Sequence, residues 1–120
     1  MPIRAKSRGE AGRSNDPPVL ILTSLASGPK HGYALQQDIE SFAAVRLGPG
    51  TLYGAIARLE ERGLIEPLGA AGRRRPYRLT AAGAEALGAA LAELRAIVET
   101  GAARLAGAAP PRVAIAGGSA

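Results

Sequence analysis

The 120-residue chain has no cysteine and no tryptophan, and it has a single histidine, His31. Without cysteine it forms no disulfide, no thiolate zinc site and no thiol nucleophile. A serine-based catalytic triad would have to use His31, and no nucleophile-elbow pattern accompanies it. The composition therefore predicts no enzyme, no metal site and no cofactor, and the lack of cysteine fits a reducing cytoplasm.

Aromatic residues and long apolar runs are also scarce. Aromatic residues make up 3% of the chain and hydrophobic residues 47%, so we expect a core of aliphatic side chains. The apolar run at residues 19–22 follows Asp16, Pro17 and Pro18, and it is too short for a signal peptide or for the roughly 18 apolar residues of a membrane span. We expect a cytoplasmic protein without a membrane segment.

The net charge of +5 is unevenly distributed. Residues 1–16 carry four basic and two acidic side chains, residues 17–80 eight and five, and residues 81–120 three and three. A polyanionic partner is therefore expected on the first two thirds of the chain. The balanced last third is left for another partner.

The segment from Gly48 to Ile65 is the centre of the predicted fold. Pro49 suits a first helical position, and Gly63 suits the residue that ends a helix. At about 100° per residue, one stripe of the helix 49–62 is apolar and is assigned to the core: Leu52, Ala55, Ile56 and Leu59. The opposite face starts with small residues and fits a DNA major groove, although an ordinary surface helix has the same amphipathic pattern.

The neighbouring elements complete a winged helix-turn-helix over residues 17–80. We expect a disordered basic arm at residues 1–16, a buried helix from Pro17 to about Ala26 with Asp16 as its N-cap, and a second helix from Lys30 to about Ser41. Residues 45–47 alternate like a short strand, and residues 64–68 and 76–79 predict a β-hairpin with a basic tip. Three short helices followed by a hairpin are typical of a winged helix, a mainly α fold with a small β-hairpin.

A long helix is predicted over residues 81–106, with Thr80 as its N-cap. Its apolar residues recur with heptad spacing, which predicts pairing with a second chain. The predicted dimer interface consists of Leu87, Leu91, Leu94, Val98 and Leu105. Residues 107–120, rich in glycine and proline, are expected to form a flexible tail.

Four blocks of the sequence resemble the PadR-like transcriptional regulators. These are Gly28-Pro29-Lys30-His31-Gly32-Tyr33-Ala34-Leu35, Gly48-Pro49-Gly50-Thr51-Leu52-Tyr53, residues 58–65 and residues 73–83, in the family's order and spacing. The resemblance covers about residues 18–95. It implies a cytoplasmic homodimeric winged-helix repressor whose C-terminal helices pair, released when an effector alters the separation of the recognition helices. The chain is similar to the short members with one C-terminal helix.

The predicted contacts to double-stranded DNA come from three places. Thr51 and Tyr53 are similar to positions that touch DNA in the family, while His31 and Tyr33 fit either phosphate contacts or the capping of a helix start. Arg58 fits either a guanine edge or an ion pair with Glu61. The full predicted set is Lys30, His31, Tyr33, Gly50, Thr51, Tyr53, Gly54, Arg58, Arg73, Arg74 and Arg75.

Two other functions fit the same sequence. One is a winged-helix module whose basic surface binds an acidic protein without specific DNA binding, since a fold does not determine a function. The other is a sensor that binds a hydrophobic small molecule between the C-terminal helices of two protomers, where leucine and alanine would line an apolar cavity.

Overall fold

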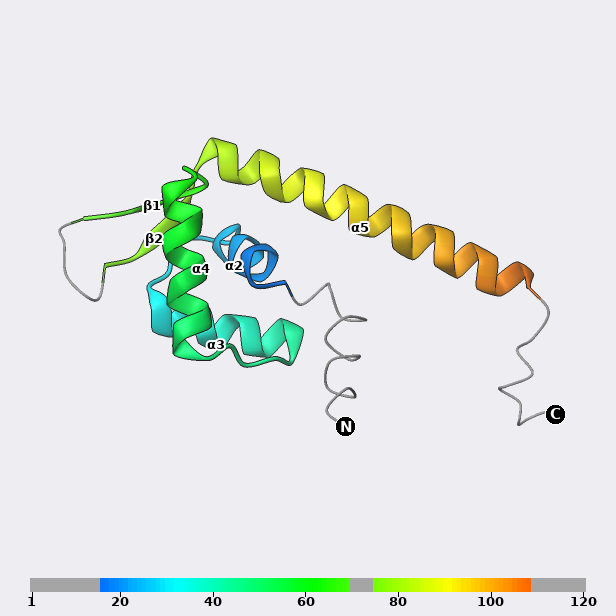
Figure 1. The fold of residues 1–120 in the computed structure, drawn as a ribbon, viewed down its shortest axis with the longest axis horizontal. Coiled ribbons are helices and arrows are strands. Elements are labelled where there is room, and N and C mark those ends of the chain that lie inside the picture. The colour runs from blue at the N-terminus through cyan, green and yellow to red at the C-terminus, as the bar shows by residue number, and fades with distance from the viewer. Residues whose placement is uncertain (1–15, 70–74, 109–120) are drawn as a thin grey trace. The chain divides into compact units, whose positions relative to one another are not determined.

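The structure is a computed structural model that describes residues 16–69 and 75–108. In chain order the elements are α2 (Pro17–Leu25), α3 (Gly32–Ala43), α4 (Pro49–Glu61), β1 (Ile65–Pro67), β2 (Tyr77–Leu79) and α5 (Ala81–Gly107) (Figure 1). The chain forms two compact units divided after Ala89, and α5 contributes to both. The predicted N-terminal arm up to residue 15, the hairpin tip with Arg73 and Arg74, and the tail from residue 109 lie outside the described residues.

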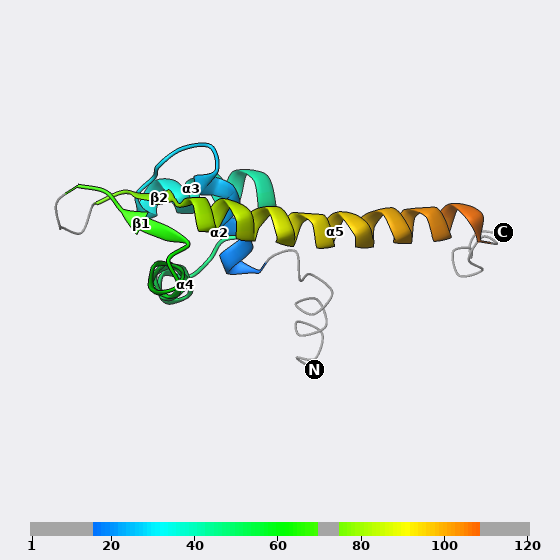
Figure 2. The ribbon, with the colours of Figure 1, turned by 90° about the horizontal axis from the view of Figure 1, so that it is seen from above.

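The first unit is built around an aliphatic core between α2, α3 and α4. α2 is apolar on most sides and buries Leu20, Ile21, Leu22 and Leu25, as predicted. α3 contributes Leu35 and Ile39, both fully buried. Figures 1 and 2 show α4 crossing α3 steeply, so that α4 is seen along its axis in the second view.

α4 begins at Pro49 as predicted, ends at Glu61, one residue before the predicted end, and has the predicted buried stripe. Its four predicted core residues are all buried: Leu52, Ala55, Ile56 and Leu59. At its C-terminus the Gly63 N–H donates to the Glu60 carbonyl and the Leu64 N–H to the Leu59 carbonyl, both at 3.0 Å. This pair of bonds is a Schellman motif, and it requires the positive φ of 76° that Gly63 adopts.

The β-hairpin is antiparallel, with Ile65 opposite Leu79 and Glu66 opposite Arg78. The other edge of β2 pairs with the loop before α3, because the Lys30 N–H donates to the Tyr77 carbonyl at 3.1 Å and the Tyr77 N–H to the Lys30 carbonyl at 2.9 Å. The hairpin is thus attached directly to the helix-turn-helix.

The strand predicted at residues 45–47 is wrong. These residues connect α3 to α4 without regular structure. The alternation has another cause: Leu47 is buried in the core, Val45 is half-buried against it and Arg46 is exposed. The strand-like neighbour of β2 is instead Lys30.

Two helix caps were predicted, and one of them is confirmed. The Thr80 hydroxyl accepts a hydrogen bond from the Gly83 N–H at 3.0 Å and donates to the Gly63 carbonyl at 2.7 Å. It therefore caps α5 and ties that cap to the end of α4. Asp16 precedes α2 as predicted, but its side chain makes no capping hydrogen bond; its backbone carbonyl accepts the Leu20 N–H at 3.1 Å.

The start of α5 belongs to the core of the first unit. Leu87 is only 7% exposed and packs in the core cluster. The part of α5 from Ala90 belongs to the second unit, where Leu94 is half-buried and the other large apolar residues are exposed: Leu91, Ile97, Val98 and Leu105. The exposed apolar side of α5 therefore starts at Leu91, because Leu87 is covered by its own chain.

Candidate nucleic-acid interface

The solvent-facing side of α4 carries small residues in its first turns. Gly50 and Thr51 are exposed, and Gly54 is half-buried. Among the described residues, a Cβ added to Gly50 would meet no atom within 4 Å, so the first turn of α4 is open to the approach of another molecule. The first N–H groups of a helix have no partner within it and carry the positive end of the helix dipole, which favours phosphate oxygens.

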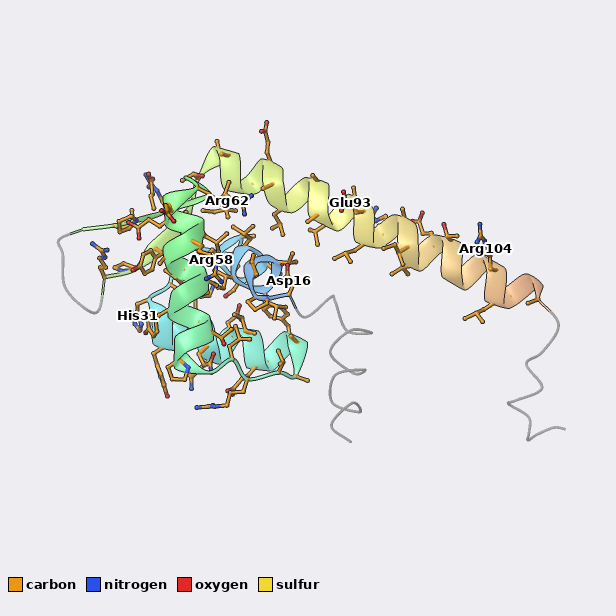
Figure 3. All side chains as sticks on the ribbon, in the orientation of Figure 1. Asp16, His31, Arg58, Arg62, Glu93 and Arg104 are labelled. Carbon is orange, nitrogen blue, oxygen red and sulfur yellow. The ribbon has the colours of Figure 1, made fainter. Side chains whose placement is uncertain are left out.

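Arg58 lies on α4, one turn after Gly54 (Figure 3). Its Nη1 lies 3.6 Å from the position that a Cβ on Gly54 would occupy, so the missing side chain at Gly54 makes room for the guanidinium. The described residues contain no ion pair between Arg58 and Glu61; their ion pairs join Arg46 to Glu40 and Arg78 to Glu66. Arg58 therefore keeps its donors for another partner.

The N-terminus of α3 presents His31 and Tyr33. His31 occupies the N-cap position with extended backbone, but its side chain makes no capping hydrogen bond. Tyr33 is 67% exposed, and its hydroxyl accepts a hydrogen bond from Gln37 Nε2 at 3.1 Å. Capping thus does not account for His31, and core packing does not account for Tyr33.

Tyr53 joins the starts of α3 and α4. Its side chain is half exposed, and a Cβ added to Gly32 would overlap its hydroxyl and the adjoining ring carbons. Gly32 is the first residue of α3 and is buried. Because this residue has no side chain, Tyr53 can reach across and bring the N-termini of both helices to one place on the surface.

A pocket of about 200 Å³ opens beside this junction. Its lining combines apolar residues from the α3–α4 connection and α4 with polar side chains from both helices and the connection. Gln36 Nε2 donates to the Leu47 carbonyl at 2.6 Å, while Gln36 Oε1 is buried and has no hydrogen-bond partner among residues 16–69 and 75–108. The polar side chains that line the pocket are Tyr33, Gln36, Arg46 and Tyr53.

Lys30 has a structural role that its sequence context does not reveal. Its ammonium donates to the Ser24 carbonyl at 2.5 Å, the Ser27 hydroxyl at 2.8 Å and the Gly28 carbonyl at 3.4 Å. A cation at this place stabilises the carbonyl end of α2. The Lys30 ammonium thus has a hydrogen-bond acceptor within the chain for each of its three donors.

The base of the hairpin holds two further arginines. The Arg75 guanidinium lies 5.8 Å from the centre of the Tyr77 ring, a cation–π arrangement. Arg78 pairs with Glu66 directly across the hairpin, with Nε and Nη2 each 2.7 Å from Oε2. Arg75 keeps its positive charge near the tip of the hairpin, whereas the charge of Arg78 is balanced by its neighbour.

Three residues at the pocket or on the exposed apolar side of α5 were not predicted from the sequence as site residues. Arg46 and Gln36 line the pocket, and Ile97 widens the apolar side of α5 with 67% of its surface exposed. The only sequence signal for Arg46 was its charge next to the Gly48-Pro49 helix start. No sequence pattern indicates a role for Gln36. The hydrogen bonding of its amide depends on where the fold places the Leu47 carbonyl.

The described segments, 16–69 and 75–108, contain no cluster of His, Asp or Glu that could hold a metal ion. Within the same segments no helix is both long and apolar enough to cross a bilayer.

Residues 21–89 match the transcriptional regulator PadR-like family. A relative from Streptomyces fradiae, described as an uncharacterized 37.1 kDa protein in transposon Tn4556, is 55% identical over 75 residues, which are 62% of this chain and 22% of that protein. The structure is similar to a PadR family transcription regulator from Clostridium difficile R20291, with 28% identity, a TM-score of 0.63, and coverage of 69% of this chain and 91% of that one. It is also similar to a PadR family transcriptional regulator from Eggerthella lenta, with 26% identity, a TM-score of 0.68, and coverage of 88% and 94%. With more than half of its length matched, the chain belongs to the PadR-like family of transcriptional regulators.

Proposed function

We propose that this protein is a DNA-binding transcriptional regulator that acts as a homodimeric repressor. The observation that carries the proposal is the junction of the N-termini of α3 and α4, held together by Tyr53 over Gly32. Two helix N-termini at one place on the surface form a favourable site for a phosphate backbone. The same arrangement directs the small-residue face of α4 toward the major groove.

The proposed contacts divide into two kinds. Tyr33 and the first turns of both helices contact phosphates, which sets the register of the protein on DNA without reading sequence. The second kind is made in the major groove by residues along α4: Thr51, Tyr53 and Arg58. Arg58 can read a guanine through its O6 and N7 atoms. Arg73, Arg74 and Arg75 contact the flanking backbone from the hairpin.

The second protomer binds along α5. The exposed residues Leu91, Ile97, Val98 and Leu105 leave an apolar side of a helix in water, and a second copy would cover it with the same residues. An isologous pair of this kind has two-fold symmetry, so its operator would have two symmetric half-sites about 10 bp or a multiple apart.

Release from DNA would follow from a hydrophobic effector bound between the paired helices. No aromatic residue lies on α5, so such an effector would meet aliphatic side chains only. A thermal-shift screen with hydrophobic compounds tests this part separately, and a flat response across a chemically broad panel would remove the effector from the proposal.

DNase footprinting on the gene's own upstream region, in about 150 mM salt with scrambled competitor DNA, tests DNA binding. We expect a protected site with two-fold symmetry. Arg58→Gln should weaken binding and relax the preference at one base position per half-site by about 1–3 kcal/mol. Arg104→Gln, which removes the same charge from the end of α5, is the matched control and should leave that preference unchanged.

A folded protein that protects no DNA would contradict the proposal. The basic surface would then be assigned to an acidic protein partner, and salt-labile, sequence-independent DNA binding would support that alternative.

A further inference from the structure

The side chains that line the pocket between α3 and α4 carry positive charge and no negative charge. Among the residues that line it there is one cation, Arg46, and no carboxylate. The helix starts at Gly32 and Pro49 add the positive ends of two helix dipoles. The two helix starts, and Arg46 once it leaves its ion pair with Glu40, favour an anionic group in the pocket. The neutral part of the lining includes the apolar residues Leu47, Pro49 and Leu52.

Arg46 is held by an ion pair that is easily exchanged. Its Nη1 lies 2.5 Å from Glu40 Oε2, and the side chains of the two residues are 75% and 35% exposed. Water competes for both partners at this exposure, so the pair contributes little to stability. A phosphate oxygen that reached Arg46 would replace a carboxylate with an equally good acceptor.

Gln36, which also lines the pocket, has one amide atom without a hydrogen-bond partner among the described residues. The orientation of the Gln36 amide is set by the hydrogen bond from Nε2 to the Leu47 carbonyl, since the opposite orientation would place two acceptor oxygens together. Oε1 is therefore left buried without a partner among the described residues. A guanidinium has five N–H donors in a planar fork. Arg46 turned away from Glu40 therefore has donors for a phosphate oxygen.

We propose that Arg46 is a DNA phosphate contact that Glu40 masks in the free protein, and that the pocket receives one sugar–phosphate unit of the operator. The inference rests on the proposed function and names a contact outside α4 and the hairpin. The apolar lining packs against the deoxyribose, while Arg46 and the Tyr33 hydroxyl donate to the phosphate. Glu40 keeps Arg46 in an ion pair until a DNA phosphate replaces the Glu40 carboxylate.

Fluorescence anisotropy with an operator duplex, measured over a series of salt concentrations, tests the proposal. Arg46→Gln should lower the slope of log K against log salt by about 1 and weaken binding about fivefold near 150 mM salt, because one counterion fewer is released. Arg46→Lys should restore the slope. Arg104→Gln removes an equal charge elsewhere and should change neither quantity.

Glu40→Gln is the complementary variant. It releases Arg46 from its ion pair and should tighten DNA binding about two- to fivefold. In the Arg46→Gln background, Glu40→Gln should leave the DNA affinity unchanged, because the guanidinium that Glu40 masks is absent. Circular dichroism melting of each variant checks that these exposed substitutions leave the fold intact.

The results separate this inference from the proposed function. If the wild-type protein binds the operator and Arg46→Gln keeps its slope and affinity, the masked contact does not exist. A gain from Glu40→Gln that persists without Arg46 would also overturn it, since simple charge repulsion would then explain the gain. A wild-type protein that fails to bind DNA at all would reject the proposed function itself.

Discussion

Gly83 and Gly88 lie on the same helix, α5, but their surroundings differ completely. A Cβ on Gly83 would overlap the Leu64 backbone carbonyl oxygen and press on the Leu79 side chain, whereas a Cβ on Gly88 would meet nothing within 4 Å. The backbone of α5 thus approaches the end of α4 as closely as a glycine allows. Leu64 is held there by its own bond to Leu59 and by the Thr80 N–H, which donates to the Leu64 carbonyl at 3.1 Å.

Gly83→Ala should therefore destabilise the protein by about 1–3 kcal/mol, because the clash is with backbone and cannot be relieved by a rotamer change. Gly88→Ala, the matched control, should stabilise it by about 0.4–1 kcal/mol through the lower entropy of the unfolded chain. Urea denaturation of both variants measures the difference. Equal stabilities would mean that α5 does not pack on the Leu64 carbonyl.

At the scale of elements, the C-terminus of α2 is capped by Lys30, one of the predicted DNA contacts. Ser24 is buried and its hydroxyl donates to Asp38 Oδ2 at 2.6 Å, which joins α2 to α3. The Ser24 carbonyl accepts from Lys30, whose backbone in turn pairs with Tyr77 of β2. One lysine thus connects α2, the start of α3 and the hairpin.

Lys30→Met should lower stability by about 1 kcal/mol, since the end of α2 loses its cation. The salt dependence of DNA binding should stay as in the wild type, because the ammonium is already bound within the chain. A fall of about 1 in the slope of log K against log salt would instead make Lys30 a phosphate contact. Thermal melting and the same anisotropy titration provide the two readouts.

At the scale of the whole molecule, the two units have different solvent exposure. The first has a closed core, while the second is a helix whose large apolar residues are mostly exposed. A lone helix gains most of its stability from packing of its apolar side. With the proposed pairing of α5, the stability of the second unit should depend on protein concentration.

Replacing Leu91 and Val98 together by Gln should convert the proposed dimer to a monomer, because the exposed apolar side of α5 loses its centre. Analytical ultracentrifugation measures the change. Ala96→Gln, which places the same side chain at an exposed position on the other side of the helix, should leave the dimer intact. A wild-type protein that sediments as a monomer at micromolar concentration would contradict the proposed role of α5.

The sequence alone predicted the order and type of the main elements. Proline and glycine at the two ends of α4, threonine before α5 and the period of the buried leucines are local signals, and the structure confirms each of them. The four sequence blocks likewise identified the family. These properties depend on residues close together in the chain, so they can be read without knowing the fold.

Only the tertiary structure decided which side chains are available to a partner. Lys30 is used by α2, Leu87 is used by the core, and the alternation at residues 45–47 reflects burial instead of strand pairing. Arg46 and Gln36 meet at a pocket because α3 and α4 cross there. Each of these outcomes depends on residues far apart in the chain, and their hydrogen bonds and contacts exist only after the helices have packed.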